Sequence, residues 1–515
     1  MIIIANRNSY PGSTNLQRDD NGDQLLTNGK EPNVQAYLGY GIIVAAVLGA
    51  VIIISISDLD TYPWVAVAGT AALCVYLFAL NRPVIGLYIL TLAAAFIDYK
   101  LIHEVRFFVG SIPINLIEIA IFFVMYLAVP SLLLNPTQKG STHHTLKHGP
   151  FGLWIIFLVT ISTFGFIRGA VSNSLYDASR DIRSVVLILI SFLLTRKYVT
   201  SWKIWKTIAT IIFLGGIYSI IIRVMSYLQP SLDFTSYLDI RSVVPGTASL
   251  EFTFILVVAF IVCRHYLFGR RYFTWILLLM SFLAYFLTFS MTAYIFMILV
   301  PVFSVLLSPS QLPKKLKIGL AMGCLPMIVL YYGVTTFAEI EGGGMFGNVL
   351  HLFGQATQQL LGLSSSIHAQ SRLDSWNAAL SELSGVQFLT GIGMGKRVFL
   401  DTQIPGIGVI VAGEPTYSTY LLGVGLIGSI VLLALQLRFV VVSYQSMKYA
   451  PDSFIRAAML AFTVYGLTTI INGFFHNNFM SPQVSVLYGV MLGLVEGSLI
   501  RPSLAGLNVA RHQQR

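Results

Sequence analysis

The chain has 515 residues, of which 56% are hydrophobic and only 10% are charged. Soluble domains carry about 25% charged residues, so this composition excludes an ordinary soluble protein and predicts an all-α polytopic integral membrane protein. The net charge of +10 does not indicate nucleic-acid binding, because the basic residues lie between apolar segments and set their orientation in a membrane.

The first 34 residues predict a disordered cytoplasmic tail. Residues 6–34 are polar and lack hydrophobic periodicity, and the apolar run Met1–Ala5 is too short for the core of a signal peptide. The three cysteines, Cys74, Cys263 and Cys324, lie in or beside apolar runs. They are expected to be small core residues, without a disulfide framework or a metal site.

Apolar runs of about 20 residues are long enough to cross a bilayer, and the sequence predicts about 12–14 of them. Transmembrane helices 1–11 are expected within 35–335 and helices 12–14 within 418–500, followed by a cytoplasmic tail over 501–515. The candidate spans are 35–57, 62–80, 83–97, 113–134, 151–167, 184–195, 207–226, 248–263, 273–289, 291–307, 318–335, 418–437, 456–473 and 482–500.

The positive-inside rule predicts the orientation. With both termini in the cytoplasm, most loops that are rich in Lys and Arg also face the cytoplasm. Residues 336–417, the longest polar segment, then form a large extracytoplasmic loop, and 168–183 and 233–242 lie on the same side.

Ten basic residues break this rule, because they lie outside or in the outer part of a span. Arginine suits a diphosphate ligand, since its planar fork donates two hydrogen bonds and keeps its charge. An alternative for Arg180 and Arg183 is simple pairing with Asp177 and Asp181. The ten are Lys100, Arg106, Arg168, Arg180, Arg183, Arg223, Arg241, Arg372, Lys396 and Arg397.

The stretch 371–397 differs from the apolar remainder of the chain. Arg372 and Trp376 are one helical turn apart, so on a helix they share a face. The alternative for Trp376 is an interfacial anchor in the bilayer. The sequence "GIGMGK", residues 391–396, lacks the P-loop spacing. Its three glycines either line an anion site with backbone N–H groups or form a bare structural turn.

The order of these features resembles the O-antigen ligase and polymerase superfamily. The similarity lies in Arg372, then Trp376, then "FLTGIGMG", and later in "EPTYSTYLLGVGLIG" at 414–428, where Tyr417 falls on the family tyrosine. The resemblance implies a membrane glycosyltransferase that uses glycans linked to a lipid diphosphate, outside the bacterial inner membrane.

The sequence also departs from the family pattern. Glu414 stands at the family histidine and Pro415 at the asparagine that follows it, while Met291 occupies the place of a family arginine. Another outer arginine, such as Arg241, Arg180 or Arg183, is expected to supply the missing charge. Glutamate in place of the ligase-type histidine favours a polymerase over a ligase.

Glycosyl transfer needs cations for the departing diphosphate and a base for the attacking hydroxyl. The expected catalytic residues are Glu414 and Arg372, with His476 as the rival base and Glu251 as a further candidate. No metal and no cofactor are expected. The expected diphosphate- or glycan-binding residues are Arg168, Arg180, Arg183, Arg241, Trp376, Lys396, Arg397 and Tyr417.

The sequence therefore predicts a multi-pass inner-membrane enzyme that polymerises undecaprenyl-diphosphate-linked repeats into O-antigen or exopolysaccharide. The alternatives are an O-antigen ligase that transfers the glycan to the lipid A core, and a transporter or flippase of lipid-linked sugars. Expected partners are the glycan donor, the glycan acceptor and the lipid bilayer, with no nucleic acid. The resemblance also allows a chain-length regulator or a flippase as a partner.

Overall fold

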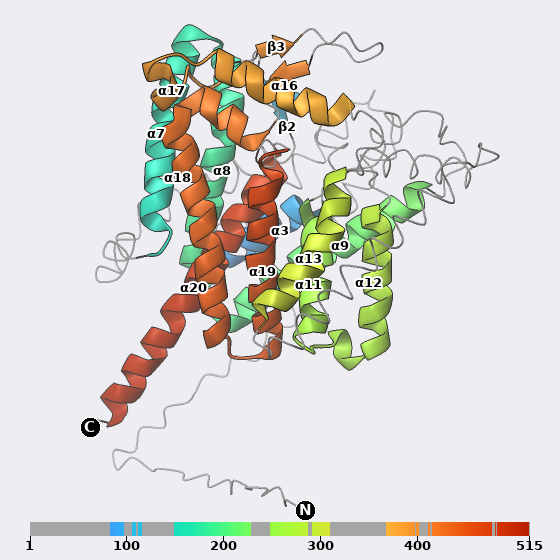
Figure 1. The fold of residues 1–515 in the computed structure, drawn as a ribbon. Helices are drawn as coiled ribbons and strands as arrows, with labels where there is room; N and C mark the ends of the chain where they lie inside the picture. The colour runs from blue at the N-terminus through green and yellow to red at the C-terminus, as the bar shows by residue number, and fades with distance from the viewer. Residues whose placement is uncertain are drawn as a thin grey trace, which may run out of the picture. The chain divides into compact units, whose positions relative to one another are not determined.

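The described part of the chain is an all-α polytopic membrane protein (Figure 1). In this computed structural model, four described helices are long and apolar enough to cross a membrane: α7 (Gly152–Ser172), α9 (Trp202–Tyr227), α18 (Thr416–Ser446) and α19 (Ser453–Asn472). The structure describes residues 83–96, 106–109, 112–115, 149–227, 248–286, 291–308, 367–396, 398–400, 410–412, 415–475, 479 and 481–513.

The remaining described elements are shorter, or more polar, than these four. Shorter apolar helices are α3 (Pro83–Phe96), α11 (Ala248–Val262), α12 (Arg271–Phe286) and α13 (Met291–Leu307). The other helices are α8 (Leu175–Tyr198), α16 (Ile367–Ser381), α17 (Val386–Thr390), α20 (Pro482–Gln513) and the 3-10 turns η1 (Leu267–Gly269) and η2 (Met447–Tyr449). Two antiparallel hairpins pair β1 (Arg106–Val109) with β2 (Ile112–Asn115) and β3 (Val398–Leu400) with β4 (Ile410–Ala412).

Every predicted span that falls on described residues coincides with a helix, with one partial exception. The predicted span 113–134 cannot begin at 113, because Ile112–Asn115 is a strand. The rest of that span and the spans 35–57, 62–80 and 318–335 lie outside the described residues.

The stretch 168–183, which separates two predicted spans, is mostly helical. α7 continues to Ser172 and α8 begins at Leu175, so only two residues connect them. The Ser174 side chain accepts a hydrogen bond from the Asp177 N–H and caps α8, which explains why α8 begins so early.

Helices α8 and α20 approach closely through small residues. A Cβ at Gly489 would lie 2.5 Å from the Ile188 carbonyl oxygen, and one at Gly493 would lie 2.5 Å from the Thr195 Cβ. Small residues four apart are typical of close helix pairs in membranes, where van der Waals packing drives association. The same pair is joined by an ion pair of 2.9 Å between Arg196 and the fully buried Glu496.

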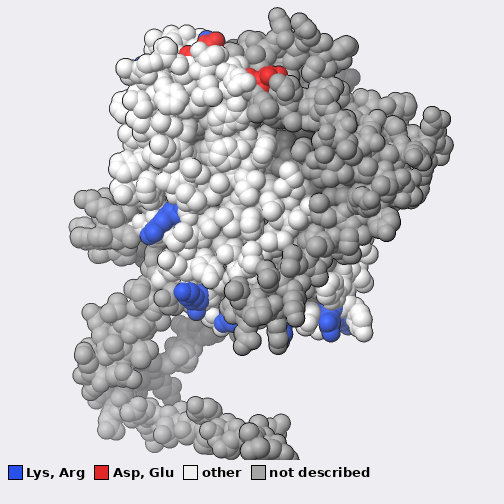
Figure 2. All heavy atoms as spheres, viewed as in Figure 1, with Lys and Arg blue, Asp and Glu red and all other residues white. Residues whose placement is uncertain are grey.

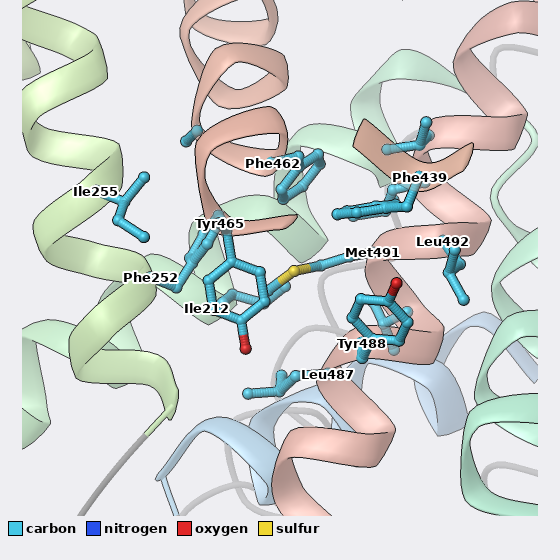
Figure 3. Packing of buried hydrophobic residues seen from close by; sticks show 14 of the residues in the cluster. Ile212, Phe252, Ile255, Phe439, Phe462, Tyr465, Leu487, Tyr488, Met491 and Leu492 are labelled. Atoms are coloured by element: carbon cyan, nitrogen blue, oxygen red, sulfur yellow. The ribbon is translucent and has the colours of Figure 1, made fainter. Parts of the chain in front are cut away.

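Aromatic side chains fill the centre of the bundle (Figure 3). Phe252 of α11 stacks on Phe462 of α19 at 5.4 Å, and Phe439 of α18 contacts Tyr488 of α20 at 5.3 Å. The indole N–H of Trp205 donates to the Leu494 carbonyl at 3.0 Å. Rings from five helices therefore meet in one core.

The helices define two ends of the bundle. One end is called here the α16 end. Helices α9, α12 and α19 end there, and helices α11 and α18 begin there. At the opposite end, Asp452 pairs with Lys206 and caps α19 through the Ile455 N–H at 2.9 Å. Burial alone raises the pKa of Asp452, but hydrogen bonds from Lys206 and Ile455 outweigh burial and lower it.

Charges are unevenly distributed over the two ends. On the face in Figure 2, most of the visible Lys and Arg atoms lie toward the end with the α18–α19 connection, whereas the visible Asp and Glu atoms, with some Lys or Arg atoms beside them, lie near α16 and α17. In the orientation predicted from the sequence, the α16 end faces away from the cytoplasm.

The close α8–α20 contact predicts a strong effect of a single methyl group. Gly489→Ala should lower the free energy of unfolding by about 1–3 kcal/mol, because its Cβ would collide with the α8 backbone. Thermal unfolding of the purified protein measures the change. Leu437→Ala, at an exposed position of α18, is the control, and an equal loss in both variants would contradict the explanation.

The orientation can be tested by cysteine labelling in intact cells. In a chain without its own three cysteines, Asn377→Cys, which is exposed on α16, should react with a membrane-impermeant thiol reagent. Lys448→Cys, exposed at the opposite end, should react only after lysis. The reverse pattern would invert the predicted topology.

Candidate functional site

The glycine turn, residues 391–395, is inserted between three helices. Gly391, Gly393 and Gly395 all have positive φ, at 75°, 122° and 83°. Cβ atoms there would lie 2.6 Å from the Gly423 carbonyl carbon of α18, 2.7 Å from the Gly169 nitrogen of α7 and 2.5 Å from the Ala178 nitrogen of α8. Both the conformation and the space therefore require glycine.

Hydrogen bonds hold the turn in this place. The Ile392 N–H donates to the Leu422 carbonyl at 2.7 Å, and the Met394 N–H donates to the Gly165 carbonyl at 2.9 Å. The Gly395 N–H donates to the buried Asp181 carboxylate at 2.8 Å. Because these donors are used within the protein, the geometry favours the structural turn over the anion site.

Helix α18 is broken where the turn meets it. Gly425 has φ 74° and ψ −172°, which interrupts the helix within its third turn. A Cβ at this position would lie 2.3 Å from the Leu389 carbonyl oxygen of α17. The break therefore allows α17 and the glycine turn to pack closely against α18.

Three of the expected ligand-binding cations have partners within the protein. Arg168 donates from Nη1 to Thr390 Oγ1 at 3.0 Å and to the Gly391 carbonyl at 2.6 Å, which satisfies acceptors at the end of α17. Arg180 pairs with Asp177 at 3.7 Å, and Lys396 pairs with Glu382 at 3.6 Å.

These contacts leave part of each cation accessible. The Arg168 residue is exposed, and the side chains of Arg180 and Lys396 keep 41% and 33% of their accessible surface. Arg183 is partly buried, one turn further along α8. The structure thus places four expected cations on α7, α8 and the end of the glycine turn.

Trp376 joins α16 to the ends of α18 and α19. Its indole N–H donates to the Phe474 carbonyl at 3.1 Å, and the two rings stack with centroids 6.3 Å apart. Phe474 also contacts Tyr417 at 4.6 Å, and the Tyr417 hydroxyl donates to Gln436 Oε1 at 2.5 Å. Trp376 therefore packs on protein, and with Phe474 and Tyr417 it forms the aromatic cluster of the α16 end.

Several expected residues cannot be placed. Glu414, His476, Arg241 and Arg397 lie outside the described residues. Arg372 belongs to α16, one turn before Trp376, but its side chain is outside the described part. Their roles stay predictions.

A second polar group lies inside the bundle at the same end. Glu251, in the first turn of α11, has a buried Oε1 without a hydrogen-bond partner, and its carboxyl group is within hydrogen-bonding reach of Thr468. The Tyr285 and Tyr465 hydroxyls lie within electrostatic range of Glu251, and Tyr285 is also in range of Arg223, which is only 3% exposed.

Glu251 and Arg223 were visible in the sequence as ionisable residues in apolar runs, which mark functional sites in membrane proteins. What the sequence did not show is that α9, α11, α12 and α19 bring them to one place with two tyrosines. Figure 3 shows Tyr465 beside Phe252, the α11 residue that follows Glu251.

No family model matches the chain, and no curated protein is similar enough to be matched. Among the described residues, no group of three or more His, Cys, Asp or Glu side chains could hold a metal ion. The candidate site is thus defined by the cations, the aromatic cluster and the buried polar group of the α16 end.

The glycine turn predicts unequal effects of two alanine substitutions. Gly393→Ala and Gly385→Ala both place a side chain at positive φ, a strain of about 1–3 kcal/mol. Only Gly393→Ala also collides with α7, since no atom lies within 4 Å of a Cβ at Gly385. Gly393→Ala should therefore lower the unfolding temperature much more, and equal shifts would show that the turn does not pack on α7.

Proposed function

We propose that this protein is a membrane glycosyltransferase that polymerises oligosaccharide repeats carried on undecaprenyl diphosphate, at the outer face of a bacterial inner membrane. The proposal rests on one observation: several groups suited to binding and catalysis lie together at the α16 end. Four expected cations, an aromatic cluster and a buried carboxyl group all lie at this end, which the sequence predicts to face the outside.

The cations suit a diphosphate leaving group. When the bond between the sugar and the phosphate breaks, negative charge grows on the departing oxygen, and positioned cations stabilise that charge. Arg168 and Arg180 keep exposed surface next to the glycine turn. Because the turn is locked by hydrogen bonds to α7, α8 and α18, the cations around it are held on a rigid support.

The aromatic cluster suits the glycan. Binding sites for small molecules are lined largely by apolar and aromatic side chains, with a few polar groups that fix orientation. Phe474 is 46% exposed, and Trp376 is partly buried against it. Their rings offer apolar faces on which sugar rings can stack, next to the start of α18 where Glu414 is expected.

The acceptor distinguishes two versions of this enzyme. A polymerase adds repeats to a carrier-linked chain, whereas an O-antigen ligase transfers the chain to the lipid A core. The glutamate at position 414 favours the polymerase, because the ligase-type pattern has a histidine there.

A transporter or flippase of lipid-linked sugars is the second candidate. Two observations favour it: Glu251 and Arg223 lie within apolar helices, and α18 is broken at Gly425. Buried ionisable residues and discontinuous helices are typical of transporters. The glycine turn, however, fills the break in α18. The cations, the aromatic cluster and the buried carboxyl group then all lie at one end of the bundle.

Purified protein in vesicles tests the proposal. The substrate is the lipid-linked repeat isolated from cells that lack this protein. Wild-type protein should lengthen the carrier-linked glycan, and Arg372→Lys should cut the yield at least tenfold, because lysine keeps the charge but loses the bidentate fork. Gel electrophoresis of the released glycans measures both effects.

The matched control is Arg438→Lys, at an exposed position of α18 away from the α16 end, which should leave the yield unchanged. Repeats that appear on the opposite leaflet without lengthening would instead establish a flippase. Transfer to the lipid A core without lengthening would establish a ligase. Full activity of both Arg372→Lys and Arg372→Ala would remove Arg372 from the site.

A further inference from the structure

The geometry points to Glu251 as the group that accepts the proton of the attacking hydroxyl, an inference that rests on the proposed function. Glu251 lies in the first turn of α11, at the α16 end, and carries an oxygen that is buried without a hydrogen-bond partner. It is thus a carboxyl group with an unused acceptor atom at the end where the cations gather.

Three of the four helices around Glu251 place polar side chains near it. α11 packs against α9, α12, α13 and α19. α9 contributes the buried Arg223, α12 contributes Tyr285, and α19 contributes Tyr465 and Thr468. The sequence of α13 contains no Asp, Glu, Lys, Arg or His.

The arrangement differs from that of Glu496, another buried carboxyl group in the described helices. Glu496 is fully buried but has Arg196 at 2.9 Å, and its Oε2 accepts from the Phe151 N–H. Among the described residues, Glu251 has no such ion pair. A buried polar atom without a partner costs free energy, and an ionisable residue in an apolar helix of a membrane protein is a candidate functional residue.

Tyr285 lies near Glu251. Its hydroxyl is within electrostatic range of both the Glu251 carboxyl group and the Arg223 guanidinium. A hydroxyl group near the carboxyl group can orient a sugar hydroxyl by hydrogen bonding. Thr468 can hold the carboxyl group in one orientation, because it is buried and within hydrogen-bonding reach.

The step balances without any further reactant. The acceptor hydroxyl oxygen forms a bond to the anomeric carbon of the donor sugar, and the bond from that carbon to the phosphate oxygen breaks. The electron pair of the broken bond leaves on the undecaprenyl diphosphate, where cations stabilise it. The hydroxyl proton passes to the Glu251 carboxylate, which later releases it to water.

This assignment differs from that of Glu414 or His476, so the three variants separate the cases. Glu251→Gln keeps the size of the side chain but removes the proton acceptor. In the vesicle assay it should lower turnover on the order of a hundredfold or more, while protein level and binding of the lipid-linked repeat stay near wild type. Loss of turnover in Glu414→Gln or His476→Ala, together with wild-type turnover in Glu251→Gln, would assign the base to that other residue.

Asp452→Asn is the matched control, since it makes the same chemical change at the opposite end and retains a residue that caps helices well. It should leave turnover unchanged. Glu251→Asp keeps a carboxylate and should retain more activity than Glu251→Gln, with a displaced acidic limb in its pH–rate profile.

The outcomes separate the two proposals. If wild-type protein forms polymer and Glu251→Gln does so equally well, Glu251 is not the proton acceptor and the proposed function stands. If wild-type protein forms no polymer from the isolated repeat, the proposed function fails and this inference fails with it. If the Glu251→Gln protein does not accumulate, Glu251→Asp provides the test. A pH–rate profile of Glu251→Asp whose acidic limb is identical to that of wild type would overturn the assignment.

Discussion

The insertion of the glycine turn into α7, α8 and the broken α18 is the contact on which the α16 end depends. Backbone meets backbone there, with Gly391 against Gly423, Gly393 against Gly169 and Gly395 against Ala178. Van der Waals contact at this range is open only to residues without a Cβ. The turn positions Arg168 and Lys396, and it connects α16 and α17 to the membrane helices.

The aromatic cluster extends this connection to α19. Trp376 binds the Phe474 carbonyl, Phe474 packs on Tyr417, and Tyr417 reaches Gln436 inside α18. Thr468, near the end of α19, is within hydrogen-bonding reach of the Glu251 carboxyl group. The end of α19 therefore contacts both the aromatic cluster and the buried polar group, and a change in one is expected to affect the other.

The two ends of the bundle use charge differently. At the opposite end, ionisable groups form structural pairs: Lys206 with Asp452, and Arg196 with Glu496. At the α16 end, the pairs of Arg180 and Lys396 are long and exposed, and the Glu251 carboxyl group has an unused oxygen. Long exposed pairs contribute little stability, so these cations can exchange partners for a ligand at small cost.

The sequence alone determined the class of the molecule and most helices, because apolar runs of spanning length have few alternatives in a bilayer. It also marked Arg372, Trp376 and the glycines as unusual, yet it left the use of those glycines open. Only the tertiary structure decided that 168–183 is mostly helical and that the turn is a packing element. It alone brought Glu251, Arg223 and Tyr285 together, because contacts between distant helices depend on side-chain packing that no local pattern encodes.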